Sequence, residues 1–69
     1  MELLSVVALL EDMPQNGLKR GHVGTVVESL APAVYEVEFS DDSGRTYASL
    51  ALRSDQVMSL HHEPGHRAA

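Results

Sequence analysis

The chain is short, acidic and free of cysteine: its 69 residues carry 5 Lys and Arg against 10 Asp and Glu, for a formal net charge of −5. This charge disfavours a nucleic-acid partner, since binding to a phosphate backbone rests on Lys and Arg that displace counterions, and the lack of Cys excludes disulfides and Cys-based zinc sites. The length allows one domain, which buries only roughly 60% of the surface that its unfolded chain exposes.

The first ten residues are almost continuously apolar, and periodicity alone does not separate a buried strand from a short helix there. We favour a strand over Ser5–Leu10, because the adjacent β-branched Val6 and Val7 lower the helix propensity and Pro14 soon ends the run. In that strand, Val7 and Leu9 are expected to face the core.

Nothing near the N-terminus predicts export or membrane insertion. Glu2 stands where a secretory signal would carry basic residues, and no apolar run approaches the roughly 20 residues of a membrane helix. We therefore expect a protein of the cytoplasm of a bacterium-like cell, without a membrane partner.

A polar loop follows at Glu11–Gly21, with a turn signal at Asn16–Gly17. Leu18 is an apolar residue in the middle of this loop, and we expect it to fold back and cover one end of the barrel described below. The loop is long for a hairpin, and long connections on a rigid scaffold are where binding groups tend to lie.

The centre of the chain predicts two paired strands, Val23–Glu28 and Val34–Phe39. Their connection, Leu30–Ala33, contains a proline, which has no N–H for a ladder and so belongs in the turn. In the second strand apolar residues alternate with Glu36 and Glu38, so the two carboxylates share the outer face.

The last third of the chain predicts a tight turn at Ser40–Gly44, where Asp side chains bond nearby N–H groups and Gly supplies a positive φ. This turn leads into a fourth strand, Arg45–Leu52. Ser54–Val57 is expected to form a single helical or 3-10 turn with Ser54 as its N-cap, before a short final strand over Met58–His61.

Together these elements predict an all-β fold, a small SH3-like five-stranded barrel with a one-turn 3-10 helix before the last strand. The alternative is an open β-sheet packed on an N-terminal helix. The barrel is assigned to residues 1–62, and a flexible C-terminal tail to residues 63–69, which hold little to bury. The expected core consists of Val7, Leu9, Leu18, Val26, Val37, Phe39, Leu50, Leu52, Val57 and Leu60.

Five stretches of the chain carry a resemblance to a known family: Val7–Pro14, Gly17–Gly21, Gly24–Val27, Tyr35–Phe39, and Gly44–Tyr47 running into Leu50–Leu52. They resemble a family of small bacterial proteins described as a domain of unknown function. The resemblance covers nearly all of the chain except the tail and implies an SH3-like barrel. Its members look like the small partner subunits of two-gene, toxin–antitoxin-like cassettes.

A more distant resemblance rests on Gly21–Val27 followed by Val34–Phe39, which is similar to the Gly-x-x-Gly-x-Val opening of KOW-type barrels. That similarity would imply contact with RNA or the ribosome. The chain departs from the pattern because it is acidic and lacks a basic loop bearing aromatic residues.

No group of residues predicts catalysis, and we expect neither a catalytic residue nor a cofactor. His61, His62 and His66 cluster with Glu63 as transition-metal ligands do, but adjacent residues of a strand point to opposite faces. We therefore expect a solvated tail and no metal site. Two acidic pairs are interpreted as solvated loop and turn charges: Glu11–Asp12 and Asp41–Asp42.

The function we expect is non-catalytic binding of a protein, as an antitoxin or immunity-type subunit that covers a basic, toxin-like partner. The binding surface would combine the Glu11–Gly21 loop with the acidic outer face of the third strand. The residues chosen for it are Met13, Leu18, Lys19, Arg20, Glu36 and Glu38.

Three other interpretations stay open. The acidic face is more simply a solvated sheet face, or one whose carboxylates pair with Arg45 or Arg53. A KOW-like module would contact RNA or the ribosome, whereas a structural homo-oligomer would close its edge strands by pairing. The residues expected to contact RNA are Lys19, Arg20, His22 and Arg45.

Overall fold

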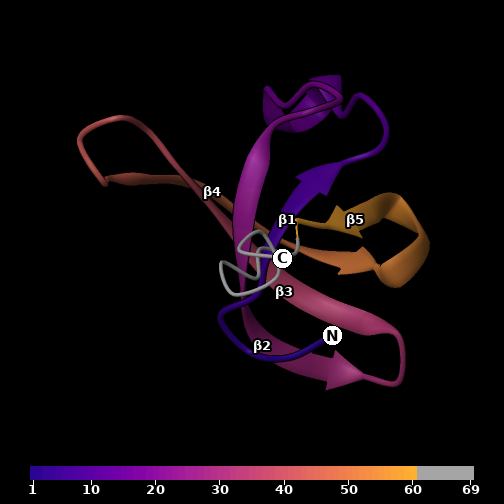
Figure 1. Cartoon of the computed structure of the whole chain (residues 1–69). Coiled ribbons are helices and arrows are strands. Elements are labelled where there is room, and N and C mark those ends of the chain that lie inside the picture. Colours follow the sequence, from indigo (N-terminus) through magenta and orange to yellow (C-terminus); the bar gives the residue numbers. More distant parts are fainter. Residues whose placement is uncertain (61–69) are drawn as a thin grey trace, which may run out of the picture.

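The computed structural model describes residues 1–60, which form one antiparallel sheet of five strands (Figure 1). The sheet order is β4-β3-β2-β1-β5, so the last strand lies beside the first and three consecutive strands form a meander. The elements are β1 (Val6–Leu9), η1 (Pro14–Asn16), β2 (Val23–Ala31), β3 (Val34–Ser40), β4 (Thr46–Arg53), η2 (Ser54–Gln56) and β5 (Val57–Ser59), where η denotes a 3-10 turn.

This arrangement is a small SH3-like barrel, as the sequence predicts. The nine-residue β2 pairs with both β1 and β3 and so belongs to both halves of the bent sheet. Its register with β3 shifts between Val26 and Glu28 and again between Ser29 and Ala31. Such irregularities increase the local twist and bend the strand, which allows one face of the sheet to enclose the core.

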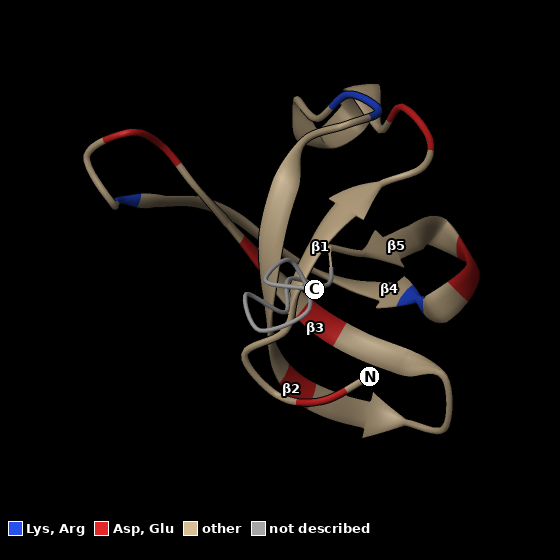
Figure 2. Cartoon of the chain, viewed as in Figure 1, with Lys and Arg blue, Asp and Glu red and all other residues tan. Residues whose placement is uncertain are grey.

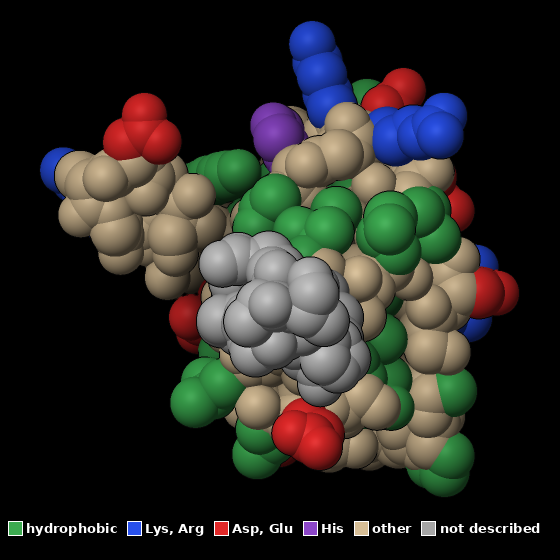
Figure 3. Space-filling model, in the orientation of Figure 1, with side chains coloured by type: hydrophobic (Ala, Val, Ile, Leu, Met, Phe, Trp, Pro, Cys, Tyr) green, Lys and Arg blue, Asp and Glu red, His purple; other side chains and the backbone are tan. Residues whose placement is uncertain are grey.

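The apolar N-terminal run forms a strand and not a helix. Val7 and Leu9 are buried on the core side of β1, as expected. Ala8 is also buried, although its side chain points to the opposite face. Its cross-strand neighbours in register are Val23 and Met58, and Figure 3 shows hydrophobic side chains gathered over this part of the barrel.

Among residues 1–60, nine hydrophobic residues are buried in the core, and the sequence predicts eight of them. Leu50 of β4 is only half-buried, but it packs against the core. The prediction for Leu60 is wrong, since its side chain is 40% exposed. Its N–H donates to the Val6 carbonyl and continues the ladder, and because Val57 points inward, a residue three positions later points outward.

The connection between β2 and β3 is tighter than the sequence predicts. β2 continues to Ala31, so the turn consists of Pro32 and Ala33 rather than Leu30–Ala33. Ala33 has a left-handed backbone (φ 62°), which the residue after Pro adopts in a type II turn. Its carbonyl accepts the Ser54 N–H at 2.9 Å, so the turn also holds the end of β4.

The single turn before the last strand is confirmed, but its cap differs from the prediction. Arg53 is the N-cap residue of η2, and the Gln56 Oε1 accepts the Arg53 N–H at 2.9 Å. Ser54 is therefore the first residue of the turn. The final strand begins at Val57 and ends at Ser59, not at His61, which lies outside the described residues.

Two further observations concern the domain as a whole. Within residues 1–60, no helix is long and apolar enough to cross a membrane. The expected tail, residues 63–69, and the boundary at residue 62 lie outside the described residues.

Candidate functional site

The loop between β1 and β2 is a folded unit and not a flexible connection. Met13 and Leu18 form an isolated β-bridge, in which the Met13 N–H donates to the Leu18 carbonyl at 2.8 Å and the Leu18 N–H returns at 3.1 Å. The 3-10 turn η1 lies between them and ends at Gly17, whose left-handed backbone (φ 70°) lets its N–H reach the Pro14 carbonyl. The loop is thus closed on itself.

Hydrogen bonds at the two ends of this loop, which we call its neck (Leu9–Asp12 and Arg20–Gly21), fix it to the barrel. The Asp12 carboxylate accepts the Arg20 N–H at 2.9 Å, and the Gly21 N–H donates to the Leu9 carbonyl at 2.8 Å. Gly21 has φ 95°, which a residue with a Cβ rarely adopts. A fixed neck places the side chains of η1 at a defined position beside β4.

A cleft of about 420 Å³ lies between this loop and the end of β4, and we call it the loop groove. Its apolar wall comes from Met13 and Pro14 on one side and from Leu50 and Leu52 on the other. The remaining lining residues are polar or small: Asp12, Gln15, Asn16, Ala51 and Gln56. Apolar walls with a few polar groups are typical of binding sites.

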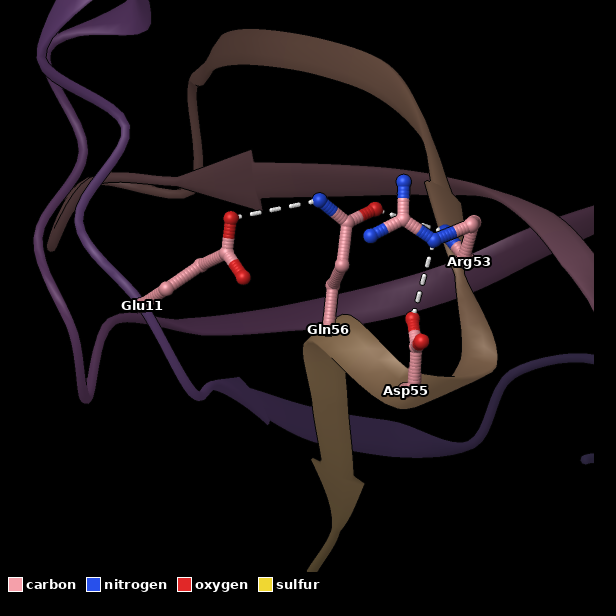
Figure 4. A network of polar contacts seen from close by, with 4 residues as sticks. All are labelled: Glu11, Arg53, Asp55 and Gln56. Carbon is pink, nitrogen blue, oxygen red and sulfur yellow. Dashed lines mark hydrogen bonds and ion pairs between the residues drawn. The ribbon is translucent and has the colours of Figure 1, made fainter.

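Gln56 joins the groove to the last turn of the barrel through three hydrogen bonds, of which Figure 4 shows the two made by its side chain, to Arg53 and Glu11. Its backbone carbonyl accepts the Leu10 N–H at 2.9 Å, and its side-chain Oε1 accepts the Arg53 N–H. Its Nε2 donates to the Glu11 carboxylate at 3.3 Å. Arg53 in turn forms an ion pair with Asp55 at 3.0 Å. Glu11 therefore adds a carboxylate at this end of the groove, whereas the Asp55 carboxylate is paired with Arg53.

The outer face of β3 carries the acidic residues that the sequence predicts. Glu36 and Glu38 point away from the core and are half-exposed, and Glu28 of β2 lies opposite Glu36 in register. The Ser49 hydroxyl donates a hydrogen bond to the Glu36 carboxylate. Figure 2 shows the Asp and Glu positions of β2 and β3 side by side, without Lys or Arg between them.

A family model, that of the domain of unknown function DUF4926, matches residues 3–59. This chain belongs to the DUF4926 family. The matched residues include all five strands and every residue that lines the loop groove. No curated protein and no solved structure matches the chain.

The DUF4926 chain does not bring all its predicted binding residues together. Met13 lines the loop groove, whereas Glu36 and Glu38 lie on the outer face of the sheet. The two regions meet at Ala51, which lines the groove and is the register partner of Glu36. Leu18 is only 1% exposed, so it covers the end of the barrel as expected and is not offered to a partner.

The basic residues of the alternative RNA surface are separated in space. Lys19 and Arg20 are exposed on the β1–β2 loop, where the His22 ring accepts the Lys19 N–H at 3.1 Å. Arg45 lies in the β3–β4 turn, directly before Thr46, and this hairpin projects from the body (Figure 1). Within residues 1–60, neither Arg45 nor Arg53 forms an ion pair with the acidic sheet face.

The remaining candidate groups have structural partners or lie elsewhere. Asp41 caps the β3–β4 turn: its carboxylate accepts hydrogen bonds from the Ser43 hydroxyl at 2.7 Å, the Ser43 N–H at 2.9 Å and the Arg45 N–H at 3.0 Å. These bonds lower the pKa of Asp41, with the hydroxyl as the largest cause. In the described part of the chain no three metal-ligating side chains cluster. Three predicted tail residues lie outside it: His61, His62 and His66.

The groove residues on β4 are what sequence reasoning missed. Leu50 and Leu52 are predicted as core, and their alternation gives no sign that they also form a wall of a cleft. Pro14 and Gln56 carry no motif either. A long loop with Pro14 and an apolar Met13 is the one signal in the sequence that points to this place.

Proposed function

We propose that this DUF4926 chain is a non-catalytic binding module that seats a segment of a protein partner in the loop groove. The observation that carries the proposal is the groove itself, a cleft of about 420 Å³ whose apolar walls belong to a fixed loop and to a strand. Preformed walls support binding because little side-chain and loop entropy is lost on association. Met13 is the apolar residue of the loop that a partner would contact first.

The charge of the chain supports a basic partner. Asp12 lines the groove, Glu11 is bonded to the groove residue Gln56, and Glu36 lies on the sheet face beyond Ala51. In a chain of net charge −5, such carboxylates attract a cationic surface and exclude an anionic one, which sets encounter rate and specificity more than affinity. An antitoxin or immunity-type subunit that occludes the basic site of a toxin-like protein is the role that fits these charges.

The experiment is affinity capture from a lysate of the source organism at near-physiological salt, with and without nuclease, read by mass spectrometry. One stoichiometric protein that survives nuclease supports the proposal. Gln15→Arg places a bulky cation at the exposed rim of the groove and should release this protein, whereas Ser29→Arg adds the same charge on exposed β2 and should retain it. Ribosomal proteins that disappear with nuclease would contradict the proposal and support RNA contact instead.

A further inference from the structure

The outer edge of β4 is unusually open for pairing. β4 has eight residues and lies at one edge of the sheet, and within residues 1–60 no strand pairs with its outer side. Its segment Thr46–Leu52 contains no charged residue, no Pro and no Gly. Proteins usually protect long edges with charges, Pro or bulges, because exposed edges pair with other chains. The opposite edge, β5, has only three residues.

The backbone groups on this edge follow from the register of β3 and β4. The Ser54 N–H donates to the Ala33 carbonyl, and the same register continues through the pairs Tyr35–Leu52 and Val37–Leu50. Because hydrogen-bonded and non-bonded pairs alternate in an antiparallel ladder, Leu52 and Leu50 bond to β3. The N–H and carbonyl groups of Ser49 and Ala51 therefore point outward.

Arg53 provides an independent check of this assignment. Arg53 follows Ser49 and Ala51 at every second position of β4, so its backbone N–H points to the same side of the strand. This N–H is bonded to Gln56 Oε1 on the outer side of β4. The outward groups of Arg53 are thus partly used by η2, while those of Ser49 and Ala51 are the ones available to a further strand.

We propose that β4 pairs antiparallel with β4 of a second copy of this chain, about a two-fold axis at Leu50. In this register Ser49 of each copy lies opposite Ala51 of the other. Each of these two residue pairs exchanges two N–H···O=C bonds, so all the outward N–H and carbonyl groups of Ser49 and Ala51 are paired. The contact is isologous, as in most homodimers. It joins the two five-stranded sheets into one continuous sheet and covers the half-buried Ala48 and Leu50 at its centre.

The charges at the two ends of β4 select a second copy as the occupant. Two chains of net charge −5 repel each other, and this uncharged edge is a place where they approach without opposing carboxylates. Antiparallel pairing sets Arg45, which directly precedes β4, near Asp55 of the second copy, which lies just beyond the end of its β4. It also sets Tyr47 opposite Arg53 of the second copy, and an aromatic ring beside a guanidinium is a favourable cation–π combination.

The first test is the oligomeric state of the purified chain, measured by light scattering and analytical ultracentrifugation from micromolar to millimolar concentration. A dimer is expected. Ala51→Pro removes an outward N–H but no bond to β3, and it should weaken dimerisation by about tenfold or more, since two hydrogen bonds are lost per dimer. Ser59→Pro is the matched control, because the β1–β5 ladder bonds Leu60 to Val6 and leaves the Ser59 N–H outward on the other edge.

The second test uses the absence of cysteine in the chain. Chains carrying Ser49→Cys mixed with chains carrying Ala51→Cys should form a covalent heterodimer under mild oxidation, because paired Cα atoms about 5.5 Å apart fit disulfide geometry. A mixture of Ser29→Cys and Ala51→Cys should not. This test stands even if Ala51→Pro prevents folding.

The outcomes separate this inference from the proposed function. A chain that stays monomeric at millimolar concentration, or a dimer unaffected by Ala51→Pro and not cross-linked between positions 49 and 51, overturns β4 pairing. The oligomeric state is measured on the purified chain without a partner, so it tests β4 pairing separately from partner capture. Because Leu50 and Ala51 also line the loop groove, a second copy and the partner are expected to compete, and partner capture is therefore judged from Gln15→Arg and not from Ala51→Pro.

Discussion

Gly24 lies directly against Phe39, with no room for a side chain between them. A Cβ at Gly24 would stand 2.8 Å from Phe39 Cε1, 2.7 Å from Val37 Cγ1 and 2.9 Å from the Glu38 carbonyl oxygen. Gly24 belongs to β2, the others to β3, and both Val37 and Phe39 are fully buried. The glycine therefore allows β2 to pass over the centre of the core.

Gly24→Ala should destabilise the barrel by about 1–3 kcal/mol, because it overpacks a filled core, and Gly24→Val should cost more. Chemical denaturation monitored by circular dichroism measures the loss. Phe39→Leu in the Gly24→Ala background should recover part of it, since the smaller side chain makes room. An unchanged thermal midpoint for Gly24→Val would mean that β2 does not pass over Phe39.

Ala33 holds a conformation that favours glycine. Its φ of 62° costs an L-residue about 1–2 kcal/mol. Glycine avoids this cost, but its greater conformational entropy in the unfolded chain offsets roughly half of the benefit. Ala33→Gly should therefore raise the free energy of unfolding by about 0.5 kcal/mol, measured in urea. Ala31→Gly is the control, because position 31 ends β2 and should lose stability. A loss at both positions would contradict the turn geometry.

Much of the fold can be predicted because successive side chains of a strand alternate between its two faces, so every second residue is apolar and buried. The alternation in β3 places Val37 and Phe39 inside and Glu36 and Glu38 outside, and the structure agrees. The prediction for Leu60 is wrong because the last strand begins at Val57 and not at Met58. Val57 points inward, so Leu60, three positions later, points outward.

The candidate site is less predictable because its walls come from opposite ends of the chain. Met13 and Leu50 meet across the loop groove, and no local pattern relates them. The closure of the β1–β2 loop depends on the bridge between Met13 and Leu18, a tertiary feature that decides which of two apolar loop residues is buried. The hydrogen bonds of Gln56 are likewise visible only when η2 lies beside the loop.

The Asp41 turn predicts a dependence of stability on pH. Hydrogen bonds from the Ser43 hydroxyl and the Arg45 and Ser43 N–H groups lower the pKa of Asp41 from its ordinary value of 3.8. A carboxyl with a lowered pKa in the folded state stabilises that state above its unfolded pKa, and this contribution is lost as the pH falls below 3.8 through the folded pKa.

Asp41→Asn should therefore reduce the acid sensitivity of unfolding. The difference in thermal midpoint between the wild-type chain and the variant should be largest near neutral pH and should shrink below pH 3.8. Asp42→Asn serves as the control for the loss of one negative charge in the same turn. Equal pH profiles for the wild-type chain and Asp41→Asn would show that the turn contributes no such stability.

The two bridged residues of the β1–β2 loop, Met13 and Leu18, should differ in their effects on stability and on partner binding. Leu18 is 1% exposed in the core, so Leu18→Ala should lower the free energy of unfolding by about 2–5 kcal/mol. This loss is a large share of the total unfolding free energy of a small domain. Met13 lines the groove and is only partly buried. Met13→Ala should cost at most about half as much stability but weaken capture of the protein partner by about tenfold. If Met13→Ala lowered stability as much as Leu18→Ala while the partner still bound with full affinity, Met13 would belong to the core alone, and the groove would not be the contact surface.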